Sequence, residues 1–204
     1  MIAIIHTGLG NFQSVSNAFA ALGQETLITH RAEDLRKARS LVLPGVGSFG
    51  HGMARLKELG FVDLLSEEVL KKKKPILGIC LGMQLMSQKG FEGGEFKGLG
   101  WVPGTVELLD TQAGALRLPH VGWNELEPRS GSRLFKGIAP GANFYFTHSY
   151  CFKPTTTVSV SALCQYGQSF VSAIESDNIA AVQFHPEKSQ DVGLKLLKNF
   201  LENF

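Results

Sequence analysis

The sequence predicts an α/β protein in which a mostly parallel central sheet is flanked by helices, with an additional antiparallel β region in the second half. As far as residue 87, short apolar runs alternate with segments of helical spacing. Runs that are apolar throughout indicate strands buried on both faces, as in parallel sheets. From residue 98 to 173 the segments are short and turn-rich, which is typical of antiparallel strands. A chain of 204 residues suits one domain, so residues 1–204 are expected to form one.

The expected elements follow from apolar spacing and from turn residues. We expect strands at 2–5, 25–28, 41–43, 75–78 and 179–184, and a β-branched strand at 156–160. We expect helices at 12–22, at 32–38, at 49–74 with a break near Gly60, from 81 to 87 and at 191–204. Pro186 should end the last strand, because proline cannot donate to the strand ladder.

Composition narrows the classes of function. The formal charge of +2 is close to balance and gives no sign of nucleic-acid binding. The chain has no run of about 18 apolar residues and no signal-peptide pattern at its start, so we expect a cytoplasmic protein. Its three cysteines and six histidines show no zinc-ligand spacing, so we expect neither a metal nor a cofactor. The lysine run at 71–74 is expected to be a solvated helix end, and the alternative is a docking patch for an acidic partner.

The segment Gly78-Ile79-Cys80-Leu81-Gly82 is the thiol version of the G-x-S-x-G nucleophile elbow, in which a strand turns sharply into a helix. Small neighbours permit the tight turn, and the helix start favours thiolate over thiol. The Leu81 amide could help to stabilise an oxyanion. The alternative for Cys80 is a buried structural cysteine, which is the expected role of Cys151 and Cys164.

A thiolate nucleophile needs a base, and His185-Pro186-Glu187 supplies one at a strand end. Residues two apart in an extended segment point the same way, so Glu187 could orient the His185 imidazole. Without Cys80, this pair would be interpreted as exposed surface residues with no catalytic role. The loop at 44–47 follows a strand expected beside the elbow strand, and Gly47 could present a second oxyanion amide. An ordinary turn is the alternative there.

Taken together, these motifs resemble those of the class I, triad-type glutamine amidotransferases, over nearly the whole chain. Three further stretches resemble the branch formed by the glutaminase subunits of imidazole glycerol phosphate synthases. They are the P-H-V-G-W-N run at 119–124, the strand at 145–150 that contains H-S-Y, and the G-L-G-N loop at 8–11. The segment Ile5-His6-Thr7 departs from that branch, where many relatives have Asp-Tyr before the first glycine.

The resemblance implies a flavodoxin-like fold and a Cys-His-Glu triad of Cys80, His185 and Glu187. It implies that L-glutamine is hydrolysed to glutamate and ammonia through a thioester. It assigns the oxyanion donors to Gly47 and Leu81, and it assigns substrate binding to Gly47, Gln84, Glu92, His148, Ser149 and Tyr150. From spacing alone, Gln84 and Glu92 would be a helix-surface pair.

The resemblance also implies a partner, a cyclase subunit with a (β/α)8 barrel that receives the ammonia in a heterodimer. Asn11 and Trp123 would lie at that interface, although Trp123 could instead be a core aromatic. Such subunits are nearly inactive alone, and a mis-set loop at 44–47 would explain this. Three alternatives remain: a paralogous glutaminase that serves another synthase, such as one making an amidino sugar; a cysteine peptidase or deglycase-like enzyme; and a non-enzymatic binding module.

Overall fold

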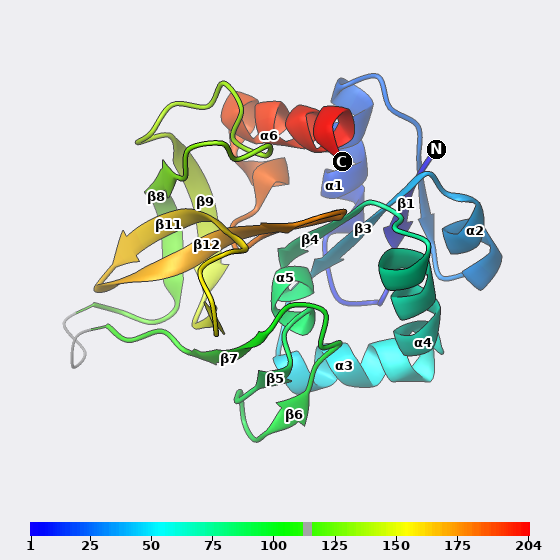
Figure 1. Ribbon diagram of the computed structural model, residues 1–204, viewed down its shortest axis with the longest axis horizontal. Coiled ribbons are helices and arrows are strands. Elements are labelled where there is room, and N and C mark those ends of the chain that lie inside the picture. Colours follow the sequence, from blue (N-terminus) through cyan, green and yellow to red (C-terminus); the bar gives the residue numbers. More distant parts are fainter. Residues whose placement is uncertain (112–115) are drawn as a thin grey trace.

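The computed structural model describes residues 1–111 and 116–204, and in this part the main feature is a nine-stranded mixed sheet (Figure 1). Its strand order is β2-β1-β3-β4-β13-β12-β11-β8-β9. The first five strands of that order are parallel: β2 (Thr26–Thr29), β1 (Ile2–Ile5), β3 (Ser40–Gly45), β4 (Ile76–Cys80) and β13 (Ile179–Val182). The other four continue the same sheet with antiparallel pairing: β12 (Gln168–Ser176), β11 (Val160–Tyr166), β8 (His120–Pro128) and β9 (Asn143–His148). The predicted antiparallel region is therefore an extension of the central sheet.

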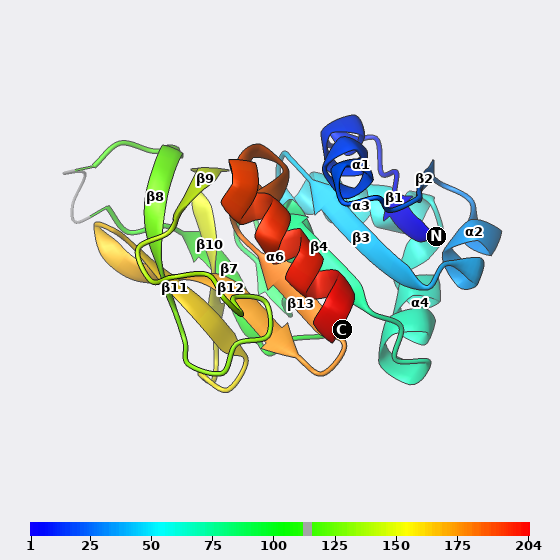
Figure 2. The same ribbon diagram turned by 90° about the horizontal axis from the view of Figure 1, so that it is seen from above.

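Helices cover both faces of the parallel half (Figures 1 and 2). One face carries α1 (Phe12–Ala21) and α6 (Gln190–Asn203), and the other carries α3 (Phe49–Glu58), α4 (Phe61–Ser66) and α5 (Leu81–Leu85), while α2 (Ala32–Lys37) lies near β1 and β2. Alternate residues of β1 pack into two hydrophobic cores, one on each face of the sheet. Ile2 and Ile4 pack in the core that includes Phe19 and Phe200, whereas Ile5 packs in the core on the opposite face.

A small second sheet borders the α3 side of the molecule (Figure 1). It contains β10 (Tyr150–Pro154), β7 (Gly104–Leu108), β5 (Lys89–Gly90) and β6 (Phe96–Lys97), in that order. The tip of this sheet packs closely on α3, because a Cβ at Gly50 would lie 2.7 Å from the Phe96 ring. Because β9 belongs to the large sheet and β10 to the small one, the turn between these two strands joins the sheets.

The structure confirms most of the predicted elements and corrects three of them. The break near Gly60 is confirmed, since this residue has φ +68° and separates α3 from α4. A π-helix, η1 (Glu67–Lys71), then ends the helical stretch earlier than predicted. The strand predicted at 156–160 is wrong, because the chain turns there and leaves Val158 93% exposed, with β11 beginning only at Val160.

The third correction concerns the lysine run at 71–74, which is not uniformly solvated. Lys74 is largely buried and donates to the carbonyl oxygens of Leu35 and Arg36. It also pairs with the buried carboxylate of Glu68 at 2.7 Å, as Lys72 does. Burial raises the pKa of Glu68, but the two lysines outweigh that effect and lower it. Within the described residues, no helix has the length and apolar character needed to cross a membrane.

Candidate active site

Cys80 lies where β4 ends and α5 begins, in the backbone conformation of a nucleophile elbow. Its φ of +53° and ψ of −107° place it in a region that residues with a side chain rarely adopt. Such strain persists only where the surrounding structure enforces it, and it is concentrated at functional sites. The geometry turns the thiol out of the sheet at the carboxyl end of β4, where open α/β folds bind ligands.

The two glycines that flank the elbow are required by close approach. A Cβ at Gly82 would lie 1.7 Å from the Leu43 carbonyl oxygen of the neighbouring strand β3. A Cβ at Gly78 would lie 2.8 Å from Met86 and 3.0 Å from the backbone of Gly82. The G-x-C-x-G spacing therefore reflects packing between strand and helix as well as the turn itself.

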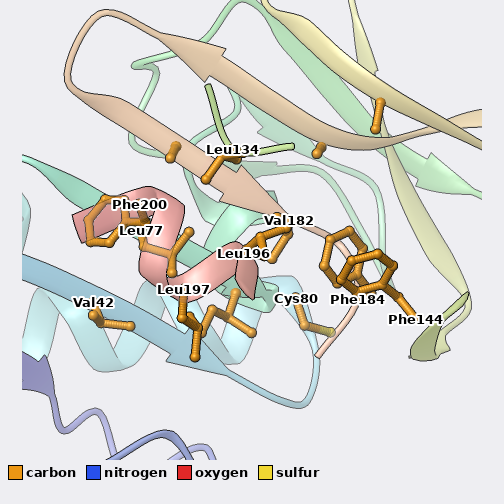
Figure 3. Close-up of a cluster of buried hydrophobic side chains, with 14 of the residues drawn as sticks. Val42, Leu77, Cys80, Leu134, Phe144, Val182, Phe184, Leu196, Leu197 and Phe200 are labelled. Atoms are coloured by element: carbon orange, nitrogen blue, oxygen red, sulfur yellow. The ribbon is translucent and has the colours of Figure 1, made fainter. Parts of the chain in front are cut away.

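The Cys80 side chain is buried beside the aromatic core formed by Phe144 and Phe184 (Figure 3). Its sulfur lies 3.6 Å from Nε2 of Gln183, which donates to it, and 3.9 Å from the Thr147 carbonyl oxygen. The helix that begins after it, α5, has only five residues. The dipole of so short a helix is small, so side-chain donors matter more for this thiol than the sequence indicates.

His185 and Glu187 form a buried pair close to Cys80. Nδ1 of His185 lies 2.8 Å from Oε1 of Glu187, and both side chains are almost fully buried. The two residues do not lie in one extended segment, contrary to the prediction, because β13 ends at Val182, before Pro186, and Glu187 lies in a short 3-10 helix, η2 (Pro186–Lys188). The backbone is held by bonds from the His185 amide to the Tyr145 carbonyl and from the Ser189 hydroxyl to the His185 carbonyl.

The pKa of His185 depends on two neighbouring side chains, Cys80 and Glu187. Burial lowers the pKa of His185, but its interactions with Cys80 and Glu187 outweigh burial and raise it to about 9. Nε2 of His185 has no hydrogen-bond partner of ordinary geometry within the described residues. Cys80 is nevertheless the neighbour that raises this pKa most, ahead of Glu187. An imidazole with this pKa readily holds the proton that a neighbouring thiol gives up.

A cavity of about 220 Å³ opens directly at Cys80. Every residue proposed for the oxyanion and substrate sites lines it: Gly47, Leu81, Gln84, Glu92, His148, Ser149 and Tyr150. Val46 and Thr147 complete the lining. The structure thus brings together side chains from β4, α5, the loop after β3, the loop after β5 and the turn between β9 and β10.

Gln84 and Glu92 are not a helix-surface pair. Gln84 lies on α5 and is 4% exposed, and its Nε2 donates to the Tyr150 carbonyl at 2.9 Å and to Oε1 of Gln183 at 3.0 Å. Both amide protons are therefore used, which leaves only the acceptor oxygen for a ligand. Glu92 follows β5 and accepts a bond of 2.9 Å from the Phe49 amide at the start of α3, so one carboxylate oxygen remains for a cation.

The His148 side chain belongs to a buried chain of hydrogen bonds that fixes its tautomer. Nδ1 lies 2.9 Å from the Tyr150 carbonyl oxygen, so it carries a proton and Nε2 must accept. Nδ1 of His120, directly opposite on β8, lies 3.0 Å from that Nε2 and is the donor. Nε2 of His120 then accepts from Asn124 at 3.3 Å. Both ring nitrogens of His148 are therefore engaged within the protein.

Both of these histidines are neutral at physiological pH. Burial lowers the pKa of His120 to about 4. Burial, together with the nearby His120 and His185, lowers the pKa of His148 to about 3, against the opposing effect of its bond to Tyr150. The wall of the cavity is therefore uncharged at His148.

The loop after β3 holds one amide away from the cavity. The Val46 amide donates to the Leu9 carbonyl oxygen at 3.2 Å, which ties this loop to the turn at residues 8–11. Gly47 has φ +104°, a conformation that favours glycine, and it lines the cavity. The loop is thus anchored to the N-terminal turn, with the Val46 donor already used.

The model of the class I glutamine amidotransferase family matches residues 3–204. The chain belongs to this family. It is similar to the imidazole glycerol phosphate synthase subunit HisH 1 of Campylobacter jejuni strain RM1221, at 50% identity over 98% of this chain and 99% of that protein. It is also similar to the HisH subunit of Aquifex aeolicus, at 45% identity over 97% of this chain and 94% of that protein.

Solved structures agree on the amidotransferase fold. A crystal structure of a glutamine amidotransferase superposes with a TM-score of 0.77 at 21% identity, covering 98% of this chain and 97% of the other. The glutaminase domain of CTPS from Trypanosoma brucei with bound acivicin gives 0.67 at 16% identity, over 100% and 94% of the two chains.

The two residues predicted for the interface of this amidotransferase both lie at the surface. Asn11 caps α1 by accepting from the Ser14 amide, and it is exposed. Trp123 lies on β8, is 48% exposed and packs edge-on against Tyr145. Trp123 is therefore not a core aromatic, and Val121 on the same strand is 55% exposed.

The sequence reasoning missed three residues that touch the site: Gln183, His120 and Thr147. Gln183 precedes His185 by two residues, so it could have been found by asking what else lies at the end of that strand. His120 stands within the P-H-V-G-W-N motif, yet its contact with His148 depends on strand pairing. Thr147 contributes its backbone, for which side-chain types give no signal.

Proposed function

We propose that this chain is the glutaminase subunit of an imidazole glycerol phosphate synthase and that it works in the cytoplasm. One observation carries the proposal: a strained, buried Cys80 opens onto a small cavity beside the His185–Glu187 pair. The full-length similarity to subunits named for that synthase supports the same choice within the family. The P-H-V-G-W-N run at 119–124 adds support, because it builds the buried histidine chain next to the cavity.

The proposed reaction begins with attack of the Cys80 sulfur on the side-chain amide carbon of L-glutamine. His185 takes the thiol proton and gives it to the leaving ammonia, while Glu187 holds the imidazole in place. A glutamyl thioester remains on Cys80, and water releases glutamate from it. The Leu81 and Gly47 amides meet the developing oxyanion, and losing one such donor typically costs about 100- to 1000-fold in rate.

The remaining cavity residues bind the substrate. The free oxygen of Glu92 and the acceptor oxygen of Gln84 suit the α-ammonium group of glutamine, because both are acceptors. His148, Ser149 and Tyr150 form another part of the cavity wall. Glu92 and Gln84 are assigned to the ammonium group because each keeps an acceptor oxygen that has no hydrogen-bond donor among the described residues.

The ammonia passes to a cyclase subunit with a (β/α)8 barrel, in a heterodimer formed over the surface that includes Trp123 and Asn11. Exposed Val121 and Trp123 support an apolar contact there. The η2 segment contacts both β9 and α1. Tyr145 lies on β9 and packs against Trp123 of the neighbouring strand β8, and Asn11 caps α1, so the elements that hold the two predicted interface residues approach each other near the triad.

The isolated subunit is expected to be nearly inactive, because the Val46 amide is bonded to Leu9 and the loop is held in that setting. Binding of the partner and its ligand would shift the loop toward a setting that completes the oxyanion site. The bond to Leu9 is a specific constraint that such a shift must break.

The test is glutamate release by the purified chain, with and without the cyclase subunit and its phosphoribulosyl formimino-carboxamide ribotide substrate. We expect slow release alone and strong stimulation by the complete mixture. No release under any condition would refute the proposed function. Release by the chain alone at the full rate would refute the role of the loop. Stimulation only by an amidino-sugar synthase would instead identify a paralogous glutaminase.

A further inference from the structure

Gln183 lies at the end of β13 with no exposed surface, and both ends of its amide are engaged. Its Nε2 is 3.6 Å from the Cys80 sulfur, and its Oε1 accepts a bond of 3.0 Å from Nε2 of Gln84. Among the described residues, the hydrogen bonds of this buried side chain go to a cysteine and to another amide. Packing explains such a residue poorly, because an apolar side chain would fill the same space without the cost of desolvation.

The orientation of the Gln183 amide follows from a single backbone carbonyl. The Tyr150 oxygen can only accept, so the Gln84 atom that lies 2.9 Å from it must be the nitrogen. That same nitrogen faces Gln183, whose nearest atom must therefore be its oxygen. The Gln183 NH₂ group is then the part that faces sulfur. His148 donates to the same carbonyl at 2.9 Å and holds it from another side.

We propose that Gln183 is a positioning residue for the nucleophile, donating a hydrogen bond to the Cys80 sulfur from an amide that Gln84 and the Tyr150 carbonyl orient. The inference rests on the proposed role of Cys80 as the nucleophile.

The contacts of the sulfur explain why a donor is useful there. The Thr147 carbonyl oxygen, 3.9 Å from the sulfur, can accept from the thiol but repels a thiolate. Gln183 has no proton to accept or release at physiological pH, so it leaves proton transfer to His185. It stabilises the charged sulfur and keeps it directed to the cavity, and bonds to charged groups are the stronger kind.

The arrangement also connects the substrate cavity to the nucleophile. Gln84 lines the cavity and orients Gln183 at the same time. A ligand that pulls on the Gln84 side chain would therefore change the donor at sulfur. The two glutamines should differ kinetically: changes at Gln183 should lower kcat with little effect on KM, whereas changes at Gln84 should also raise KM.

The test is the pH dependence of Cys80 alkylation by iodoacetamide, followed by mass spectrometry of the Cys80 peptide. Q183M removes the donor at similar length, and Q183E removes it while keeping an acceptor for Gln84. Loss of a bond to a charged group should move the alkylation midpoint upward by about one pH unit, and further for Q183E because it adds negative charge. S172A is the matched control: the Ser172 carbonyl accepts from the backbone N–H of Gln183, a bond that this change keeps, while the Ser172 hydroxyl has no hydrogen-bond partner among the described residues.

An unchanged midpoint in both Gln183 variants, with thermal unfolding like that of the wild type, would overturn the proposal even if glutamine turnover were lost. A raised midpoint supports it whether or not the wild type hydrolyses glutamine, so its failure is separable from that of the proposed function. If the Gln183 variants unfold, Q84M is used instead. This change removes the bond from Gln84 that orients the Gln183 side-chain amide, so the alkylation midpoint of Cys80 should rise, but by a smaller amount. No rise in folded Q84M would overturn the orienting role.

Discussion

The parallel and antiparallel halves of the nine-stranded sheet contribute different parts of the site. The parallel half supplies reactive groups at strand ends: Cys80 follows β4, His185 follows β13, and Gly47 follows β3. The antiparallel half and the turn after it supply a wall of engaged polar groups, of which Thr147, His148 and Tyr150 face the cavity. The parallel half carries the groups that would react. The antiparallel half determines which of the atoms around them donate hydrogen bonds and which accept them.

The difference between the two halves predicts which property of the protein a substitution should change. In the parallel half, a substitution should alter turnover or the elbow that permits it. In the antiparallel half, it should alter the stability of a neutral, buried network. Cys164 on β11 is such a buried group, since burial raises its pKa to about 12, and burial also raises the pKa of Cys151, on β10 of the small second sheet, to about 11. Neither of these thiols ionises at physiological pH.

The largest expected effect is that of Cys80→Ala, which removes the proposed nucleophile. Glutamine-dependent turnover of the assembled enzyme should fall by at least about 10⁴-fold. Turnover with ammonia as the nitrogen source should remain, because the partner would still receive its substrate. Cys164→Ala is the matched control from the antiparallel half and should leave both activities unchanged. Glutamine turnover that survives in Cys80→Ala would contradict the assignment.

Glu187→Gln should have the next largest effect, because it keeps the size of the side chain but weakens its hold on His185. We expect glutamine turnover to fall by up to about 10⁴-fold. The pKa of His185 should also fall below its present value of about 9. Since that pKa is raised by folding, the stabilisation from the pair is full below about pH 6.5 and is lost as the pH rises through about 9.

Denaturant unfolding of wild type and Glu187→Gln at pH 6 and at pH 9.5 measures this contribution. The difference in unfolding free energy should be larger at pH 6. An equal difference at both values would show that His185 is not the titrating partner.

Gly82→Ala tests whether the elbow depends on close approach to β3. Its Cβ would lie 1.7 Å from the Leu43 carbonyl oxygen, so strand and helix must separate, and we expect a loss of more than about 3 kcal/mol. Gly23→Ala is the control. Nothing lies within 4 Å of a Cβ there, and only its φ of +70° should cost about 1 kcal/mol. Urea unfolding compares the two, and similar losses would mean that contact with β3 is unimportant.

The sequence predicted the parallel half well because its signals are local. The elbow glycines, Cys80 and the strand ends can be recognised from neighbours in the chain. The antiparallel half was less predictable. The β-branched segment at 156–160 has strand propensity but no partner surface, and it forms a turn. Likewise, the contact of His120 with His148 is set by the register of β8 on β9, which residue types do not specify.

The last expected effect, which appears only when the pH is changed, is acid destabilisation through His120 and His148. Folding depresses both pKa values, so their stabilisation is full above about pH 6.5 and declines as the pH falls, to be lost near pH 4 for His120 and pH 3 for His148. Each histidine should contribute up to about 1.4 kcal/mol per pH unit in this window. Between pH 7 and about pH 6 His185 gives a slope of opposite sign, because the folded imidazole is already protonated while the unfolded one takes up its proton there; below about pH 5.5 it contributes almost none.

Urea unfolding at pH 7, 6 and 5 measures that slope. His120→Phe removes one titrating group and keeps a ring in contact with Phe146 and Tyr166, so the slope should be reduced by about half. His51→Ala, at an exposed position on α3, should leave it unchanged. A slope that is the same in wild type and His120→Phe would show that the buried pair takes up protons without unfolding. The wall of the cavity would then be able to carry charge.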